Sequence, residues 1–527
     1  MKTLRTLLFL LFSVLLSVSI TELYAQDPLT NNEVDELVES VLTTFDVPGI
    51  AVAIVKDGEV ILEKGYGVSS LHTKQNVDEN TLFGIASNSK AFTCAALGML
   101  VEKGELHWDD KVVDYIPEFR LYNAYVTEDF TIRDLLTHRS GLPLGAGDLM
   151  VFPDQNNYTT NDIIHNLRYL KQSSPFRSKF DYDNLLYIVA GEVLCRVSGL
   201  SWAEYVEEQI MAPLHMTQSI GSYSRITDHT NIIDAHAPVD GKVVVVDRYD
   251  NDVLNPAGGI YSSAHDLTLW CNMWLNNGLI SDGEPEEALL TPEMIHEIWT
   301  AQTSLPVRSN NPFGSHFSAY GLGWFLTDVN GYLEASHTGG LNGMVSQITL
   351  IPELNLGIIV LTNQQNGAAF SAITNTIKQA YIGMESTNWV EKYKERETRY
   401  MAYTKGVVDE VWNKINDEID SASEKPESTI YTGSYSDKWF GEMEVMLKNG
   451  KMWLDSKQSK KLKGEMFYYK GNTFVVKWID RSMDADAFVI FNLDKEGNAN
   501  GCRMEAISPM TDFSYDFHDL EFIKMKK

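Results

Sequence analysis

The alternation of apolar and polar residues predicts both strands and helices in the first part of the chain. Short β-branched runs lie in pairs on either side of turn residues, as in β-hairpins, at residues 50–55 and 60–64 and at 346–351 and 356–361. Helical periodicity dominates between these pairs, most clearly at residues 90–102 and 185–198. We therefore expect an α+β domain over residues 26–388, in which one antiparallel sheet is flanked by helices and carries an all-helical insertion.

The C-terminal part of the chain has a different pattern of charged and apolar residues. Charged residues spread through a helical pattern at residues 389–428, which we interpret as a solvated connecting helix, because its tryptophans and tyrosines argue against a disordered linker. Beyond it, apolar and polar residues alternate around a hairpin turn at Asn449 and Gly450. Further short strands are expected at residues 473–478, 487–493, 501–506 and 520–525. Residues 429–527 therefore predict a small all-β domain, a barrel or a sandwich, of which we favour the barrel.

The N-terminus resembles an export signal. Lys2 and Arg5 precede a nearly continuous apolar stretch at residues 7–20, and Ala25 is a small residue suited to cleavage. A membrane anchor is the alternative, but the stretch is shorter than the roughly 20 residues that span a bilayer. We expect residues 1–25 to be a signal peptide and the mature protein to be exported, periplasmic or secreted, without an integral membrane span.

Charge and cysteine content narrow the range of partners. The formal net charge of −29 at pH 7 argues against nucleic-acid and anionic-membrane partners. The 4 cysteines lack metal-binding spacing and are expected to be buried free thiols. A zinc motif begins at His296 and Glu297, but Thr300 stands where a second histidine ligand would be needed. We expect no metal site.

The first candidate for chemistry is Ser87, followed by Lys90. If a helix begins near Ser87, the two side chains share one face, and the lysine amine can reach the serine hydroxyl. A serine nucleophile needs a base, and lysine can serve when burial disfavours its charge. The apolar residues after Lys90 supply that burial. Taken alone this spacing is a weak signal, since a capping serine with an exposed lysine shows the same pattern.

Two further segments can contribute to the same cleft. Tyr182 and Asn184 stand at the entrance of an apolar helix, where a tyrosine hydroxyl can relay a proton. A half-buried aromatic with Asn184 as a helix cap is the alternative. Residues 336–340 begin a strand, and glycines there allow close approach of a substrate and an N–H for an oxyanion hole. Glycines that serve only a hairpin turn are the alternative.

Together these segments resemble the three motifs of the serine hydrolase family that includes class C β-lactamases, penicillin-binding proteins and D-aminopeptidases. The matching positions, in the family's order, are Ser87, Lys90, Tyr182, Asn184, His337, Thr338 and Gly339. Family consensus is also visible at residues 135–142, 256–259 and 320–324, so that the similarity covers residues 31–384. At the other end of the chain, residues 433–435 and 512–520 resemble a lipocalin-like β-domain that is often appended to these hydrolases.

The resemblance implies a role for each matching residue. Ser87 would be the acylated nucleophile, Lys90 its base or proton shuttle, and Tyr182 a general acid or base. Asn184 would orient Lys90 or a substrate amide. The substrate and its oxyanion would be held by the Ser87 N–H and by the strand residues His337, Thr338, Gly339 and Gly340. No cofactor is implied; the partner would be a small-molecule or peptide substrate, with peptidoglycan fragments as one candidate, and a homo-oligomer is left open.

His337 departs from the family pattern. Efficient β-lactamases and DD-carboxypeptidases of this family have lysine there, whereas histidine is similar to relatives that act as D-amino-acid peptidases or esterases, and histidine is mostly neutral at pH 7. We therefore expect hydrolysis of amide or ester bonds in D-amino-acid-containing peptides or small esters. A low-efficiency β-lactamase or DD-carboxypeptidase stays open as an alternative, as does a non-catalytic penicillin-binding or sensor protein.

Overall fold

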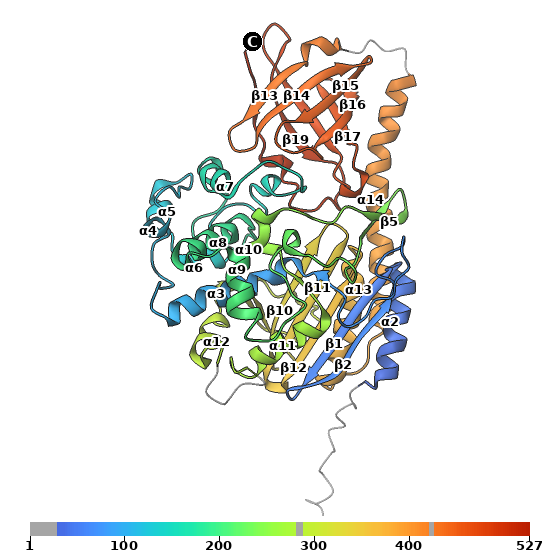
Figure 1. Ribbon diagram of the computed structural model, residues 1–527. Coiled ribbons are helices and arrows are strands. Elements are labelled where there is room, and N and C mark those ends of the chain that lie inside the picture. Colours follow the sequence, from blue (N-terminus) through green and yellow to red (C-terminus); the bar gives the residue numbers. More distant parts are fainter. Residues whose placement is uncertain (1–28, 281–287, 421–425, 527) are drawn as a thin grey trace, which may run out of the picture.

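The computed structural model describes residues 29–280, 288–420 and 426–526 of the chain. One large sheet and many helices form a body, and a β-barrel lies at one end of that body (Figure 1). A long helix, α14 (Trp389–Asp420), runs along the side of the body up to the barrel. The predicted signal peptide lies outside the described residues.

The body is built on an antiparallel 8-stranded sheet, which confirms the predicted α+β class. In spatial order its strands are β2 (Glu59–Gly67), β1 (Gly49–Lys56), β12 (Leu356–Thr362), β11 (Met344–Ile351), β10 (Tyr332–Leu341), β9 (Phe325–Val329), β8 (Ser318–Tyr320) and β7 (Thr303–Ser304). The early strand β1 pairs with the late strand β12, with Val52 opposite Val360. The two predicted hairpins are therefore neighbours in one sheet.

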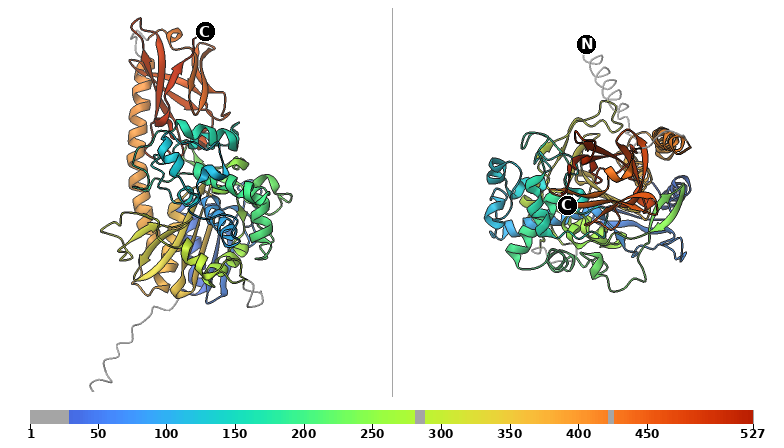
Figure 2. Two further views of the ribbon diagram at one scale, coloured as in Figure 1. Left: turned by 90° about the vertical axis from the view of Figure 1, so that its left-hand side faces the viewer. Right: turned by 90° about the horizontal axis from the view of Figure 1, so that it is seen from above.

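Helices cover both faces of this sheet (Figure 2). On one face, residues such as Val52 pack into an apolar cluster with α2 (Asn31–Phe45) and α13 (Gly367–Tyr381). On the other face, residues such as Ala53 belong to the larger cluster beneath α11 (Ala264–Leu275). Because β1 is covered on both faces, its sequence is almost wholly apolar instead of alternating.

Between β2 and β7 the chain forms the predicted insertion, which is mainly helical. Its further helices are α3 (Ser89–Glu102), α4 (Val112–Tyr115), α5 (Ala124–Asp129), α6 (Ile132–Leu136), α7 (Thr160–Asn166), α8 (Leu185–Ser198), α9 (Trp202–Val206), α10 (Asn255–Gly258) and α12 (Pro292–Ile298). Two small ribbons also lie here, formed by β3 (Phe83–Gly84) with β6 (Tyr261–Ser262) and by β4 (Ala235–Val239) with β5 (Lys242–Val246). The buried helices α3 and α8 are the two that periodicity predicted.

The C-terminal part is a closed antiparallel barrel, as predicted. Its strands follow one another in chain order as β13 (Gly433–Asp437), β14 (Gly441–Lys448), β15 (Lys451–Ser456), β16 (Lys463–Lys470), β17 (Thr473–Trp478), β18 (Ala487–Leu493), β19 (Ala499–Ala506) and β20 (Phe522–Lys524). Buried apolar side chains such as Leu454 and Phe491 fill the interior. Outside, Ile415 of α14 packs against Val475.

The barrel and the body share a buried boundary. One apolar cluster runs from the helices of the body to barrel residues such as Tyr431. Polar contacts cross the same boundary: Asn166 Nδ2 donates to the Trp439 carbonyl at 2.8 Å, and Lys461 pairs with Asp154 at 2.9 Å. The barrel is therefore packed onto the body as well as joined to it through α14.

The 4 cysteines form no disulfide with one another and are free thiols. Cys94, Cys271 and Cys502 are buried, as expected, whereas Cys195 is partly exposed. Burial raises the pKa of Cys94 to about 12, which keeps this thiol protonated and unreactive at neutral pH.

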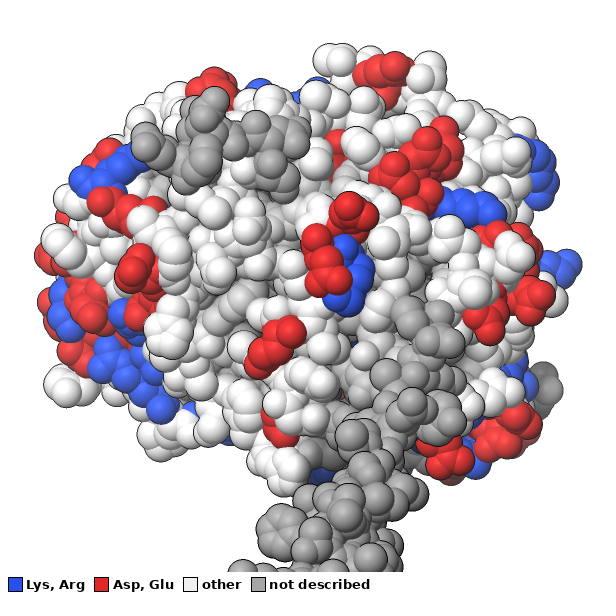
Figure 3. Space-filling view, turned by 90° about the horizontal axis from the view of Figure 1, so that it is seen from below, with Lys and Arg blue, Asp and Glu red and all other residues white. Residues whose placement is uncertain are grey.

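The face of the body away from the barrel carries both acidic and basic side chains, with uncharged residues between them (Figure 3). The net negative charge therefore does not make this face uniformly acidic. Within the part of the chain that the structure describes, no single helix is long and apolar enough to cross a membrane. Helix α8 and the segment Trp202–Met211 meet the length and composition limits only together, as a pair bent by 75°.

Candidate active site

Ser87 lies in a short 3-10 turn, Ala86–Asn88, that leads directly into helix α3. The α-helix itself begins at Ser89, slightly later than the sequence suggested. Between residues 81 and 98, Ser87 alone is not buried. Ala86 adopts a φ of 50°, a left-handed conformation that is unfavourable for a residue with a Cβ. The fold thus presents a single hydroxyl from an otherwise buried segment.

Lys90 is fully buried beneath Ser87. Its Nζ lies 3.2 Å from Ser87 Oγ, 2.8 Å from Asn184 Oδ1 and 2.9 Å from the carbonyl oxygen of Ala257. All three partners are uncharged. Burial lowers the pKa of Lys90 to about 7, although nearby carboxyl groups raise it in part. Lys90 can therefore lose its proton near neutral pH and accept one from the serine hydroxyl.

Tyr182 lies beside Ser87, a few residues before the buried part of α8. Its hydroxyl hydrogen-bonds the Ser87 side chain, and its ring centroid lies 4.8 Å from Lys90 Nζ. Burial raises the pKa of Tyr182 well above its ordinary value, while the bond to Ser87 opposes that rise. The phenol therefore keeps its proton at neutral pH and is available as a donor.

Asn184 stands at the N-cap position of α8, but its side chain makes no capping hydrogen bond. Instead its Oδ1 accepts from Lys90, and its Nδ2 donates to Asp148 Oδ2 at 2.8 Å. The helix-cap alternative is therefore wrong. Asn184 contacts both the Lys90 amine and a buried carboxyl group.

Strand β10 brings the predicted residues of the third motif against the Ser87 turn. Thr338 and Gly340 are exposed, whereas His337 and Gly339 are buried. A Cβ at Gly339 would lie 2.1 Å from the Ile85 carbonyl oxygen, but one at Gly340 would meet nothing within 4 Å. The close approach that we expected a substrate to make is thus made at Gly339 by the protein's own backbone. Of these two glycines, only Gly340 borders open space.

His337 is 2% exposed, and both of its ring nitrogens have partners. Its Nε2 lies 3.1 Å from the Tyr320 hydroxyl, and its Nδ1 lies 2.6 Å from the carbonyl oxygen of Thr338. A neutral ring with its proton on Nδ1 satisfies both contacts. Burial, and then the neighbouring Lys90, lower the pKa of His337 to about 3. The imidazole is therefore neutral at pH 7 and supplies no fixed positive charge.

Three buried residues at this site were not among the predicted ones. His138 stacks on Tyr182 with 4.2 Å between ring centroids, and its Nδ1 accepts the backbone N–H of Asp183. Burial raises the pKa of Asp183 to about 7 and that of Asp148 well above its usual range. His138 lies in the family-consensus stretch 135–142, which was an available signal. Asp148 belongs to no motif, and no local pattern marks it as a site residue.

The barrel also reaches the site. The Phe513 ring meets the Tyr182 ring edge-on, with 5.9 Å between centroids. Asp516 accepts the backbone N–H groups of Gly147 and Leu149 at 2.7 and 3.0 Å. Both barrel residues lie in the stretch 512–520, which resembles a lipocalin-like domain but predicted no contact with the hydrolase cleft. One side of the site is therefore formed by the C-terminal barrel.

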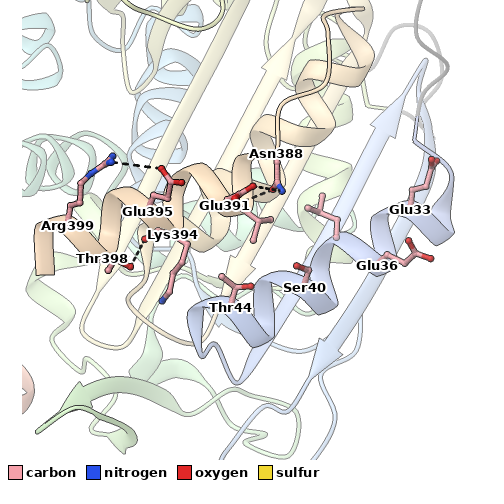
Figure 4. Close-up of a pocket in the computed structure, with 12 residues that line it drawn as sticks. Glu33, Glu36, Ser40, Thr44, Asn388, Glu391, Lys394, Glu395, Thr398 and Arg399 are labelled. Atoms are coloured by element: carbon pink, nitrogen blue, oxygen red, sulfur yellow. Dashed lines mark hydrogen bonds and ion pairs between the residues drawn. The ribbon is translucent and has the colours of Figure 1, made fainter. Parts of the chain in front are cut away.

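Two surface grooves differ in their relation to Ser87. A groove of about 800 Å³ lies between α2 and α14 and is lined by charged side chains such as Glu33 and Arg399 (Figure 4). None of the predicted site residues lines it. A groove of about 370 Å³ lies between the body and the barrel and is lined by Asp181 and Phe513. The smaller groove adjoins the site, because Asp181 precedes Tyr182 in the chain and the Phe513 ring contacts the Tyr182 ring.

Comparison with known proteins agrees with this geometry. The profile of the Beta-lactamase family matches residues 34–381, which contain Ser87, Lys90, Tyr182 and strand β10. The chain belongs to the Beta-lactamase family. The profile of a domain of unknown function, DUF3471, matches residues 420–524, which include the whole barrel of this β-lactamase-family protein.

Individual relatives support the same assignment. Unguisins hydrolase ungD of Aspergillus violaceofuscus is 28% identical over 444 residues, covering 80% of this chain and 77% of that protein. Protein flp of Staphylococcus aureus is 29% identical over 340 residues, so that the match spans 64% of each protein. The octameric penicillin-binding protein homologue from Pyrococcus abyssi has a TM-score of 0.59 at 21% identity, covering 94% of this chain and 100% of that one. This structural likeness shows a shared fold.

Proposed function

We propose that this family member is a serine hydrolase that acts through an acyl-enzyme on Ser87 and cleaves amide or ester bonds. The observation that carries the proposal is the environment of Lys90. A fully buried amine lies 3.2 Å from a partly exposed hydroxyl and contacts only uncharged groups. Such an amine can act as a base toward serine. A protein that only binds ligands would not need a desolvated amine at this place.

In the proposed acylation, Lys90 Nζ takes the proton of Ser87 as the serine oxygen attacks the substrate carbonyl carbon. The carbonyl electrons move to oxygen, and the resulting oxyanion accepts the N–H groups of Ser87 and Gly340. When the carbonyl re-forms, the bond to the leaving amine or alcohol breaks, and Tyr182 donates a proton to that group. Tyr182 then regains a proton from the Lys90 ammonium. The serine is left as an ester, and both proton carriers are restored.

Deacylation repeats these steps with water. A water molecule attacks the ester carbon and gives one proton to Lys90, directly or through Tyr182. Collapse of the second oxyanion breaks the bond to Ser87 Oγ, which regains a proton, and the acid product leaves. The placement of the Tyr182 hydroxyl against Ser87 supports its use in both halves of the reaction.

The neutral His337 supports a choice of substrate class. Where efficient β-lactamases of this family carry lysine, this chain has a buried imidazole whose pKa is lowered to about 3. A substrate carboxylate beside the scissile bond therefore gains no fixed cation from this residue. We propose peptides that contain D-residues, and small esters, as better substrates than β-lactams. The name of the Aspergillus relative, a hydrolase, supports a hydrolytic rather than a purely binding function.

Intact-mass spectrometry after treatment with a fluorophosphonate tests the proposal. We expect a single adduct in the wild type and none in Ser87→Ala, which should also lose hydrolysis of p-nitrophenyl acetate while keeping its fold, because only a small hydroxyl is removed. Ser89→Ala is the matched control, since the Ser89 hydroxyl accepts the Ile260 N–H inside the body. It should keep the label. An adduct in Ser87→Ala, or none in the wild type, would contradict the proposal.

A further inference from the structure

A segment of the barrel penetrates the body beside the Ser87 site. The fully buried Asp516 accepts the backbone N–H groups of Gly147 and Leu149 at 2.7 and 3.0 Å. These two residues flank Asp148, the first residue of the 3-10 turn Asp148–Met150. A single carboxyl group of the C-terminal barrel thus holds the body's chain on both sides of Asp148.

Asp148 is in turn connected to Lys90 through Asn184. Asp148 Oδ2 accepts from Asn184 Nδ2 at 2.8 Å, and Asn184 Oδ1 accepts from Lys90 Nζ at 2.8 Å. Because Asp148 Oδ2 is an acceptor, it selects the NH₂ group of the amide and leaves the amide oxygen for Lys90. A continuous series of contacts therefore runs from the barrel to the proposed base.

The turn that carries Asp148 is tightly enclosed. Gly147 adopts a left-handed φ of 77°, and an added Cβ there would lie 2.6 Å from Leu185 Cδ1. Leu185 is the neighbour of Asn184 at the start of α8. A shift of the turn would therefore disturb both partners of the Asp148–Asn184 hydrogen bond.

We propose that Asp148 and Asp516 are positioning residues of the hydrolase site, and that the barrel is thereby part of the catalytic unit. Asp516 holds the turn, Asp148 fixes the amide of Asn184, and that amide presents its oxygen to the Lys90 amine. The inference rests on the proposed function, because it assigns these residues to the base of that mechanism. Neither carboxyl group exchanges a proton with the substrate.

Asp148 in its ionised form also acts on Lys90 through charge, and burial, which raises the pKa of Asp148, opposes that form. Burial lowers the pKa of Lys90, and among the groups that oppose burial Asp148 has the largest effect. The other titratable groups facing Lys90 are Cys94, His138, Tyr182, Asp183, Tyr187 and His337. Asparagine at position 148 is always uncharged and keeps an acceptor for Asn184, so Asp148→Asn tests whether the hydrogen bond alone is sufficient.

Steady-state hydrolysis of p-nitrophenyl acetate by full-length variants tests the proposal, with active sites counted by fluorophosphonate titration. Asp516→Ala and Asp148→Ala should each lower kcat about tenfold and change KM less than about twofold. Asp148→Asn, which keeps an acceptor for Asn184, should keep kcat within about threefold at pH 8. The double alanine variant should be no slower than the slower single variant, because both residues act through one series of contacts.

Asp437→Ala is the matched control. Asp437 is a buried barrel carboxyl group that accepts the N–H groups of Trp439, Phe440 and Glu521 within the barrel itself. Its loss should lower the urea midpoint of unfolding and leave kcat unchanged. A wild-type kcat in Asp516→Ala, or a wild-type kcat in Asp148→Ala, would overturn the proposal. A wild-type protein that neither labels nor hydrolyses the ester would instead overturn the function on which it rests.

Discussion

Lys90 and Lys378 are both buried in the body, but their direct partners differ. Lys378, on α13, pairs with the carboxylate of Glu334 at 2.7 Å, and both side chains are buried. Lys90 contacts the Ser87 hydroxyl, the Asn184 amide and a backbone carbonyl. A buried ion pair holds its charges because removing one leaves the other unpaired. A buried amine among uncharged acceptors loses that support and gives up its proton more readily.

The two lysines lie on opposite sides of strand β10. Glu334 and His337 are three residues apart on that strand, so their side chains point to opposite faces. One faces the layer of α13, and the other faces the Ser87 site. Burial by itself therefore does not distinguish a structural ammonium group from a candidate base in this protein. Direct contact with a carboxylate makes that distinction.

Replacing each lysine by methionine should separate the two roles most strongly. Lys90→Met removes the proposed base and should lower kcat/KM for p-nitrophenyl acetate by about 10²- to 10⁴-fold, with a small change in stability. Lys378→Met leaves Glu334 unpaired in the interior and should lower the free energy of unfolding by about 3–5 kcal/mol. Its kcat per labelled site should match the wild type. Urea unfolding and steady-state kinetics on both variants provide the measurement.

A double variant gives the control for this pair. Lys378→Met combined with Glu334→Leu replaces the ion pair by apolar side chains, which is often neutral or stabilising. We expect it to regain most of the stability that Lys378→Met loses. If Lys378→Met instead lowered kcat as much as Lys90→Met, the distinction between the two lysines would be wrong.

The pH dependence of activity should follow Lys90 alone. The base must be neutral, and burial lowers the pKa of Lys90 to about 7, so kcat/KM should rise as the pH passes through about 7. Below that value it should fall about tenfold per pH unit. Rates from pH 5 to 9 provide the measurement, and Lys378→Arg, which keeps its ion pair, should show the same limb. A flat profile across this range would remove Lys90 as the base.

The smallest expected effect concerns stability in acid. The folded-state pKa of His337, about 3, lies below the unfolded value near 6.5. Between those values the unfolded chain binds a proton that the folded chain does not, so stability decreases as the pH falls below 6.5, by up to about 1.4 kcal/mol per unit. His337→Gln should reduce that slope, whereas His296→Gln, at an exposed position, should not. Equal slopes in the three proteins would argue against a buried neutral imidazole.

Local periodicity located much of the fold. The predicted helix at residues 185–198 has the bounds of α8, and the predicted strands at 473–478 and 487–493 have those of β17 and β18. Strand β16 was not predicted; in the structure Met466 faces the barrel interior and Phe467 packs against the α14 cluster.

The candidate site was predictable where its residues form compact motifs. Ser87, Lys90, Tyr182 and His337 stand at recognisable spacings, and the structure brings them together. The role of Asn184 could not be decided, because capping and lysine binding call for the same residue at a helix entrance. The Asp148 and Asp516 carboxyl groups could not be found at all. Their neighbours at the site are distant in sequence, and no local pattern encodes such a contact.

The sequence by itself indicated Ser87, Lys90 and Tyr182 as candidate residues and located most of the longer helices and strands, because such patterns depend on near neighbours. Only the tertiary structure decided which buried lysine keeps a carboxylate partner. Asn184 and Ala257, two uncharged partners of Lys90, lie 94 and 167 residues from it in the sequence. Glu334 lies 44 residues from Lys378 in the sequence. Desolvation and charge pairing act through space. The proton affinity of an amine is therefore set by residues that folding brings together, and the spacing of a motif leaves it undetermined.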